Sequence, residues 1–300
     1  MPCENPCPGW YSGDNKRLFE LLSVFLNLRP DYITPDMIES IAGKNARKEE
    51  TEYAYAALVA SACGLDIYGN REDRRFFAES FRKCFTLLDT GPFTGNPYYT
   101  NISFENISNN RWQLQKRVCR PFEAFVFDDP EISGDVGGFS VTPKIGFFNE
   151  AYNYPAVLEN GREWMTLMPN ETNTSGYAVD NAHGRVLTFG LGLGYFAYMA
   201  ARKPEVSSVT VVELSRDVIS LFEEHILPQT GFQDKIRVIR ADCFDFADGM
   251  KPGEYDFLFA DIWHDPSDGV EAYLRLKEYE PRFPGTEFVY WIENTLKLYI

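Results

Sequence analysis

The chain of 300 residues is 44 % hydrophobic and 15 % aromatic, enough to bury the core of one large domain or two ordinary ones. Its 29 Lys and Arg against 44 Asp and Glu give a formal net charge of −15, which argues against a nucleic-acid partner. No stretch reaches the roughly 20 apolar residues of a membrane span, and Met1–Pro6 lacks the features of a secretory signal. Six scattered cysteines are typical of reduced thiols, so we expect a cytoplasmic protein without a membrane partner.

Residues 1–97 predict a helical N-terminal region. Apolar residues recur at helical spacing from Leu18 to Leu26. Thr34 is a favourable N-cap, and Pro35 stands at the first position of the helix that it would begin. We expect two further helices, over Lys48–Cys63 and over the phenylalanine-rich stretch 76–88, whose aromatic side chains we interpret as core.

Residues 98–178 predict a β-rich connecting region. Strand-like runs at 118–127, 139–141, 145–148 and 164–168 are separated by turn-type clusters at 128–130 and 134–138. The aromatic and polar run 147–173, which includes Tyr152, Tyr154, Trp164 and Asn170, is a candidate wall for a substrate. The alternative is that these side chains simply pack between the two halves of the chain.

Residues 179–300 alternate between strands and helices. Apolar strand-like runs are found at 185–189, 209–212, 236–239, 256–260 and 287–292, and helix-like runs follow the first, second and fourth of them. Because parallel strands need long crossover connections, this order predicts an α/β domain with a doubly wound parallel sheet. We place its boundary at residue 179.

Glycines or carboxylates follow four of these strands, at the sheet edge where such domains bind ligands. Gly190–Gly194 follows the first strand, and such a loop before a helix offers N–H groups to an anionic ligand. Glu213 ends the second strand, where a carboxylate can accept the hydroxyls of a ribose. Asp242 follows the third strand, where it can accept an adenine amino group, and Asp261 ends the fourth. The series predicts a nucleoside-containing ligand.

The third glycine of the loop decides between two such ligands. In the Gly-x-Gly-x-x-Gly fingerprint of dinucleotide-binding enzymes it would stand where Tyr195 stands, and here it comes one residue earlier, at Gly194. The segments VLTFGLGLGYF, VTVVELS, IRADCF and YDFLFAD together resemble the motifs of class I S-adenosylmethionine-dependent methyltransferases, over about residues 180–295. The resemblance implies a Rossmann-like methyltransferase fold, C-terminally short, with S-adenosylmethionine as cofactor.

The resemblance also implies a role for each of these residues. Gly190, Gly192 and Gly194 would line the methionine and ribose part of the cofactor, and Glu213 the ribose hydroxyls. Asp242 and Cys243 would line the adenine, and Asp261 would lie near the sulfonium and a small-molecule substrate.

Methyl transfer requires positioning and removal of a proton from the acceptor. Asp261 is our candidate for orientation, and His264 or Asp265 is our candidate base. In the alternative interpretation His264 caps the loop and Asp265 begins a turn before Pro266. We predict no metal, although Glu293 and Asn294 with Asp261 form an alternative Mg²⁺ ligand set.

Two alternative functions remain open. The segment Asp261–Pro266 is similar to the strand-four motif of spermidine synthase and its relatives, which are aminopropyltransferases, but it is one residue longer, and Gly190–Gly194 lacks that family's usual aspartate. The third function is that of a non-catalytic methyltransferase-like binding protein. The short sheet leaves an edge that earlier strands cover, that a second copy covers in a homo-oligomer, or that stays uncovered.

Overall fold

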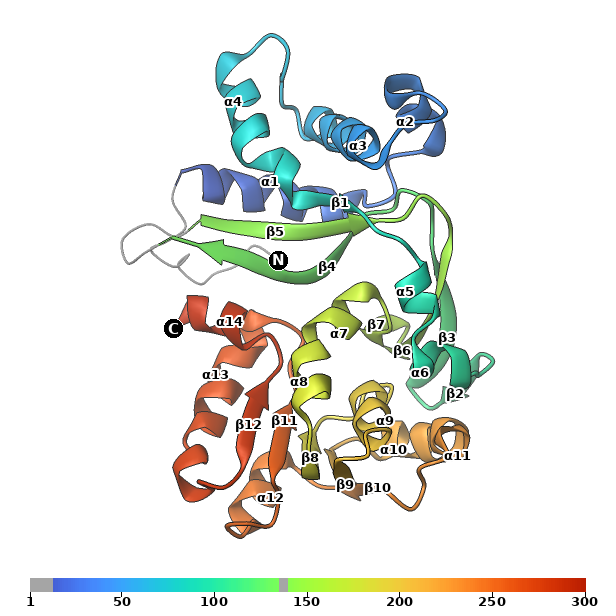
Figure 1. Ribbon diagram of the computed structural model, residues 1–300, viewed down its shortest axis with the longest axis vertical. Coiled ribbons are helices and arrows are strands. Elements are labelled where there is room, and N and C mark those ends of the chain that lie inside the picture. Colours follow the sequence, from blue (N-terminus) through green and yellow to red (C-terminus); the bar gives the residue numbers. More distant parts are fainter. Residues whose placement is uncertain (1–12, 135–139) are drawn as a thin grey trace. The chain divides into compact units, whose positions relative to one another are not determined.

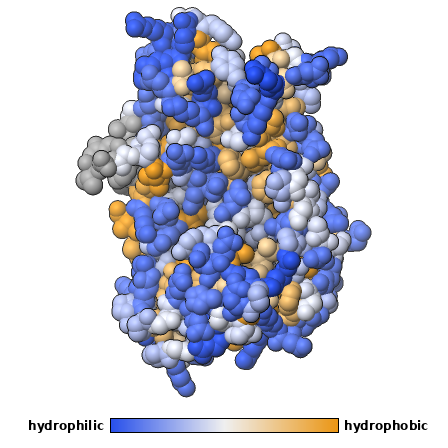
Figure 2. Space-filling model, in the orientation of Figure 1, coloured by the Kyte–Doolittle hydropathy of each residue, from blue (hydrophilic) through white to orange (hydrophobic). Residues whose placement is uncertain are grey.

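The computed structural model describes residues 13–134 and 140–300 (Figure 1). Cys3, Cys7, Phe139 and the turn-type residues 135–138 lie outside the described residues. The chain forms two compact units that alternate along the sequence: residues 1–90 with 118–152, and residues 91–117 with 153–300. The division at 97/98 and 178/179 stays a prediction. Hydrophilic side chains cover most of the face drawn in Figure 2.

In its described residues, the first unit combines four α-helices with a three-stranded sheet of order β1-β5-β4. Its elements are α1 (Asp14–Leu28), α2 (Pro35–Ala42), α3 (Lys48–Ala62), α4 (Arg71–Glu79), β1 (Phe85–Leu87), β4 (Phe125–Ser133) and β5 (Ser140–Phe147). The first three helices confirm the predictions, and the Thr34 hydroxyl accepts a hydrogen bond from the Met37 N–H as an N-cap. The core is aromatic: the rings of Tyr55 and Phe147 stack with centroids 3.8 Å apart.

The prediction of one helix over residues 76–88 is wrong beyond Glu79. Residues 81–84 form a 3₁₀ turn, and Phe85 begins β1, which pairs with β5 in parallel. The apolar spacing was read correctly as core, because Phe76, Phe77 and Phe81 are all buried. Pairing with a strand some sixty residues later along the chain overrides the local helical pattern.

The prediction of a single strand over residues 118–127 is also wrong. The chain turns between β3 (Trp112–Cys119) and β4, and Phe122 at the turn has a positive φ of 64°. The expected turn at 128–130 lies inside β4, where the pairing with β5 shifts register near Asp128. Of the short runs expected at 139–141 and 145–148, residues 140–141 and 145–147 belong to one strand, β5.

The second unit contains two sheets. The smaller has the order β2-β3-β6-β7, and the larger has five parallel strands in the order β10-β9-β8-β11-β12. Besides β3, the strands of the smaller sheet are β2 (Ile107–Asn109), β6 (Tyr152–Glu159) and β7 (Arg162–Thr166). The strands of the parallel sheet are β8 (Gly184–Phe189), β9 (Val206–Glu213), β10 (Ile236–Arg240), β11 (Phe257–Ala260) and β12 (Glu287–Tyr290). Four helices of this unit precede the parallel sheet in the chain: α5 (Gly91–Thr94), α6 (Pro97–Asn101), α7 (Pro169–Thr174) and α8 (Gly176–Asn181).

Helices connect the parallel strands, and the alternating pattern predicted them except between the third and fourth strands. The connecting helices are α9 (Tyr195–Ala201), α10 (Arg216–Leu221), α11 (Leu227–Thr230), α12 (Cys243–Gly249) and α13 (Pro266–Lys277), with a π-helical turn at Phe222–Ile226, and α14 (Glu293–Leu296) follows the last strand. The prediction of a mixed α/β chain with a parallel sheet is confirmed. The fifth strand ends two residues early, since Ile292 has a positive φ of 48°.

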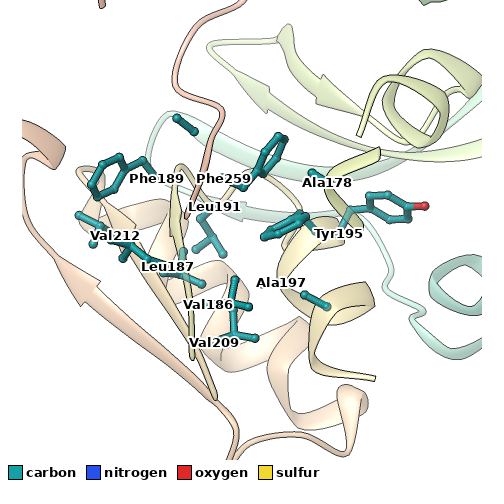
Figure 3. Packing of buried hydrophobic residues seen from close by; sticks show 14 of the residues in the cluster. Ala178, Val186, Leu187, Phe189, Leu191, Tyr195, Ala197, Val209, Val212 and Phe259 are labelled. Atoms are coloured by element: carbon teal, nitrogen blue, oxygen red, sulfur yellow. The ribbon is translucent and has the colours of Figure 1, made fainter. Parts of the chain in front are cut away.

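The strands of the parallel sheet carry almost continuous apolar runs, which is typical of strands buried on both faces. Val186 and Leu187 of β8 pack in one cluster with Phe259 of β11 and with Leu191, which follows β8 (Figure 3). The loop after β8 is therefore anchored by the core of the sheet. None of the helices over residues 13–134 and 140–300 is long and apolar enough to cross a membrane. The four described cysteines are free thiols.

Candidate functional site

A cavity of about 840 Å³, the strand-end cavity, lies in the second unit where β8, β9, β10 and β11 end. Its volume is typical of small-molecule sites, which span about 300–1,000 Å³. Gly190, Gly192, Glu213, Asp242 and Asp261 all line it. The structure thus brings together side chains and glycines that are up to 71 positions apart in the sequence (Gly190 to Asp261).

The glycine loop after β8 needs glycine for close packing. Gly190 has φ +95°, and a Cβ there would lie 2.0 Å from the carbonyl oxygen of Asp261. Gly194 has φ +71° and is the N-cap of α9, and a Cβ on it would lie 2.2 Å from the ring of Phe222. Gly190 lets two strand ends approach, whereas Gly194 serves helix packing and does not line the strand-end cavity.

Several backbone N–H groups of this loop already donate hydrogen bonds within the chain. The Leu191 N–H donates to the Glu213 carboxylate at 3.2 Å, and the Leu193 N–H lies 3.0 Å from the thioether sulfur of Met165 on β7. The loop is therefore held in shape by side chains from two other strands. Met165 also lines the cavity.

Glu213 is a largely buried carboxylate at the end of β9. It accepts hydrogen bonds from the backbone N–H groups of Leu191 at 3.2 Å and Ser215 at 2.7 Å. Burial raises the pKa of Glu213, although these N–H groups act in the opposite direction. Each oxygen keeps a further lone pair for a hydroxyl donor on a ligand.

Asp242 and Cys243 lie side by side in the cavity wall after β10. One oxygen of Asp242 accepts hydrogen bonds from the N–H groups of Phe244 and Asp245 and so caps α12, a helix that the sequence pattern did not predict. Burial raises the pKa of the Cys243 thiol to about 12. That thiol is therefore a neutral part of the wall.

Asp261 shares the cavity with a second carboxyl group, Glu171 of α7. Burial raises the pKa of Asp261 to about 7, with His264 acting in the opposite direction. Glu171 is only 8 % exposed, and burial together with the charge of Asp261 raises its pKa well above the usual range. Two neighbouring buried carboxyl groups cannot both ionise easily, so the pair retains a proton near neutral pH.

The two candidate bases after β11 have different surroundings. His264 lines the cavity, and its Nδ1 lies 2.8 Å from the carboxylate of Asp268, which sequence analysis missed. Asp265 does not line the cavity, and its carboxylate accepts the Ser267 N–H to cap α13. Asp265 therefore matches the alternative interpretation, a turn residue before Pro266.

Four of the five tryptophans of the chain line the strand-end cavity: Trp112, Trp164, Trp263 and Trp291. The Trp164 ring meets the Trp112 ring edge to face at 5.3 Å and the His264 ring at 4.1 Å. Of the predicted wall residues, Trp164 and Asn170 line the cavity, while Tyr154 is not among its lining residues.

Sequence analysis missed Glu171 and three of the tryptophans. Glu171 lies inside the predicted wall 147–173, directly after Asn170, but sequence analysis gave it no role of its own. These tryptophans come from β3 and from just after β11 and β12, and each is more than fifty residues from Trp164 in the sequence. The only signal was the position of Trp263 shortly after the strand-like run 256–260 and of Trp291 near the end of the run 287–292.

The alternative Mg²⁺ ligand set is not assembled. The Glu293 carboxylate accepts the Tyr273 hydroxyl at 2.8 Å and lies 3.2 Å from the Lys297 ammonium, and Glu293 does not line the cavity. Within residues 13–134 and 140–300 there is no group of three Asp, Glu, His or Cys side chains arranged to hold a metal ion.

Comparison with known proteins gives only distant similarities. No protein-family model and no curated protein matches the chain. Among solved structures it is similar to precorrin 8w decarboxylase from Methanobacterium thermoautotrophicum, with 18 % identity, 37 % of this chain and 56 % of that chain covered, and a TM-score of 0.29.

Two further solved structures are similar at the same level. Spermidine synthase from Thermotoga maritima gives 14 % identity over 41 % of this chain and 48 % of that chain, with a TM-score of 0.31. A candidate O-methyltransferase from Klebsiella pneumoniae gives 19 % identity over 34 % and 46 %, with a TM-score of 0.27. The chain thus spans about half the length of the structures that it matches.

Proposed function

We propose that the chain binds S-adenosylmethionine in the strand-end cavity and transfers its methyl group to a small molecule. The observation that carries this proposal is that a single cavity collects the glycine loop, Glu213, Asp242 and Asp261 from the ends of four parallel strands. Carboxylates at these positions suit the hydroxyl and amino groups of a nucleoside. The motif resemblance of residues 180–295 supports the same ligand.

The strand order supports a doubly wound, Rossmann-like sheet as part of this proposal. The chain runs outward from β8 to β10, then returns to β11 and continues in the other direction to β12. With right-handed crossovers, these two directions place helices on opposite faces of the sheet. The switch point lies between β8 and β11, where Gly190 and Asp261 meet.

The cavity fits the cofactor in its shape and its polar groups. Gly190 and Gly192 line the cavity, with the Met165 thioether packed against Gly192, and Glu213 and Asp242 offer acceptor oxygens on the neighbouring strand ends. S-adenosylmethionine, when bound, supplies an electrophilic methyl group. Asp261 is proposed to orient the acceptor, and His264, held by Asp268, is proposed to take its proton.

Aminopropyl transfer is the second candidate, and one observation favours it. An aminopropyltransferase uses an amine as its acceptor, and the cavity presents two neighbouring carboxyl groups, Glu171 and Asp261. The two reactions differ in their donor, because aminopropyl transfer uses decarboxylated S-adenosylmethionine. A methyltransferase-like protein that only binds its ligand is the third candidate.

Calorimetric titration separates these candidates. The titrants are S-adenosylmethionine, S-adenosylhomocysteine, decarboxylated S-adenosylmethionine and NAD, applied to the wild type, to Glu213→Ala and to a control, Glu287→Ala. Glu287 is exposed at the start of β12 and does not line the cavity. We expect micromolar binding of the first two ligands to the wild type and the control, and loss of binding in Glu213→Ala.

The other outcomes are equally informative. Preference for the decarboxylated donor would favour aminopropyl transfer. Binding of S-adenosylmethionine without transfer to any acceptor tried would favour the non-catalytic protein. No binding of any of the nucleoside ligands would overturn the proposed function.

A further inference from the structure

We propose that the acceptor is an amine that binds in its protonated form, held by the carboxyl groups of Glu171 and Asp261 between the tryptophan rings of the strand-end cavity, and that gives one N–H proton to His264 before its nitrogen acts as the nucleophile. This inference rests on the proposed function, because it names the acceptor of that same site. It concerns Glu171 and the tryptophans, of which only Trp263 lies within a motif segment of the parallel sheet, Asp261–Pro266.

Glu171 is a buried acid whose carboxyl group has no hydrogen-bond partner in the described part of the chain. It is 8 % exposed and lines the cavity, and no hydrogen bond to its carboxyl oxygens is found among residues 13–134 and 140–300. Burying a carboxyl group without a partner is unfavourable by several kcal/mol in typical cases. A ligand with N–H donors would form hydrogen bonds with the Glu171 carboxyl oxygens. We therefore assign Glu171 to ligand recognition.

Asp261 reinforces the same preference. It lies close enough for its charge to raise the pKa of Glu171, and its own carboxylate also has no hydrogen-bond donor in the described part of the chain. Near neutral pH such a pair holds one proton and one negative charge. One ammonium group balances that charge and donates up to three hydrogen bonds.

The charges around the cavity favour a cation over an anion. Six Asp and Glu residues line it against three Arg residues and no Lys. One of the arginines, Arg111, is already paired with Glu159, at 2.8 Å between Nε and Oε1. A carboxylate or phosphate acceptor would be repelled by Glu171 and Asp261.

The tryptophans supply the second component of amine recognition. Indole rings attract a cation over their faces by about 0.5–2 kcal/mol each, and more when water is excluded. Trp112 and Trp263 are buried, whereas Trp164 is 43 % exposed, so the wall runs from the interior to the surface. The carbon chain of an amine can therefore lie along the rings while its charged end reaches Glu171.

Tryptophan fluorescence tests the proposal without any turnover. The probes are 1,4-diaminobutane and benzylamine, each paired with its neutral analogue, 1,4-butanediol or benzyl alcohol, with S-adenosylhomocysteine present. At least one amine is expected to change the fluorescence and to bind at least tenfold more tightly than its alcohol. Trp164→Leu is expected to weaken amine binding severalfold.

Glu171→Gln tests the residue itself, because it keeps the shape and removes the charge. It is expected to weaken amine binding at least tenfold, to keep its affinity for S-adenosylhomocysteine within threefold, and to unfold no earlier in urea than the wild type. Glu287→Gln is the matched control and is expected to behave like the wild type. Its side chain is exposed and outside the cavity.

Three results would overturn the acceptor class while leaving the proposed function intact. They are binding of S-adenosylhomocysteine with no binding of either amine, equal binding of amines and alcohols, and amine binding that Glu171→Gln does not weaken. Failure of the wild type to bind any of the nucleoside ligands would instead overturn the proposed function, and with it the assignment of an acceptor.

Discussion

The carboxylate of Glu213 joins the ends of two neighbouring strands, because it accepts the N–H of Leu191 after β8 at 3.2 Å and the N–H of Ser215 after β9 at 2.7 Å. A single side chain thereby fixes the conformation of the glycine loop and stays at the cavity wall. The shape of the loop and the recognition of a ligand are coupled through this residue.

Glu213→Gln is therefore expected to weaken binding of S-adenosylhomocysteine about tenfold or more. A glutamine has only one acceptor oxygen for two N–H groups, and a buried donor left without a partner costs about 1–3 kcal/mol. Calorimetry measures the affinity, and urea unfolding shows whether the variant stays folded. Unchanged affinity in a folded variant would contradict the role given to Glu213.

The second prediction concerns Gly194, which we expect to serve packing and not ligand contact. Gly194→Ala should lower the free energy of unfolding by about 2 kcal/mol more than Gly231→Ala, because an added Cβ would overlap the Phe222 ring. Gly231 is a matched control: its φ of +72° is close to the +71° of Gly194, but nothing lies within 4 Å of the added Cβ.

Urea unfolding of the two variants measures this difference. Because both alanines bear the same backbone strain, the difference isolates the clash. Equal losses in the two variants would show that Phe222 moves aside without cost and that the close packing is not required.

The third prediction concerns Met165, whose thioether lies against the glycine loop and takes the Leu193 N–H. Removing the thioether leaves the Leu193 N–H free to donate a hydrogen bond to the bound nucleoside ligand. Met165→Ala is expected to tighten binding of S-adenosylhomocysteine about fivefold, since a hydrogen bond contributes about 1 kcal/mol net. Met165→Leu, which keeps the bulk without the sulfur, is expected to fall between the wild type and Met165→Ala. Weaker binding in Met165→Ala would show that the thioether is part of the donor site.

The alternation of strands and helices in the last third could be predicted because it is local. Each apolar run and each glycine or acid that follows it can be seen in a few residues, and the parallel sheet then places the strand ends together. The positions of Glu213, Asp242 and Asp261 at one cavity follow from this logic.

The remaining features depend on contacts between distant segments. Phe85 continues a helical pattern but belongs to β1, because β5 supplies a strand for it to pair with. Glu171 and Trp112 reach the cavity from outside the parallel sheet, and no spacing rule connects them to Asp261. The alternation of the chain between two units has the same origin, since it follows from strand pairings that no local pattern encodes.

The fourth prediction is a pH dependence of stability that Asp261 produces. Its pKa of about 7 in the folded state lies above the ordinary value of 3.8, so the folded protein binds this proton more tightly than the unfolded chain. Stability from this group is therefore lost as the pH rises toward 7, by at most about 1.4 kcal/mol per pH unit. The raised pKa of Glu171 has the same effect on stability, whereas the charge of His264 lowers the pKa of Asp261 and so reduces the effect.

Urea unfolding between pH 5.5 and 8 tests this sign. The wild type is expected to lose more stability than Asp261→Asn up to about pH 7, after which the two curves run parallel. Curves that are parallel throughout would show that Asp261 is ionised in the folded protein at pH 5.5.

A crystal structure of the protein with S-adenosylhomocysteine tests the central claim most directly. We expect the nucleoside in the strand-end cavity, with its ribose hydroxyls on Glu213 and its adenine beside Asp242. A nucleoside bound elsewhere, or a cavity that stays empty at millimolar ligand, would contradict the assignment of this cavity as the donor site.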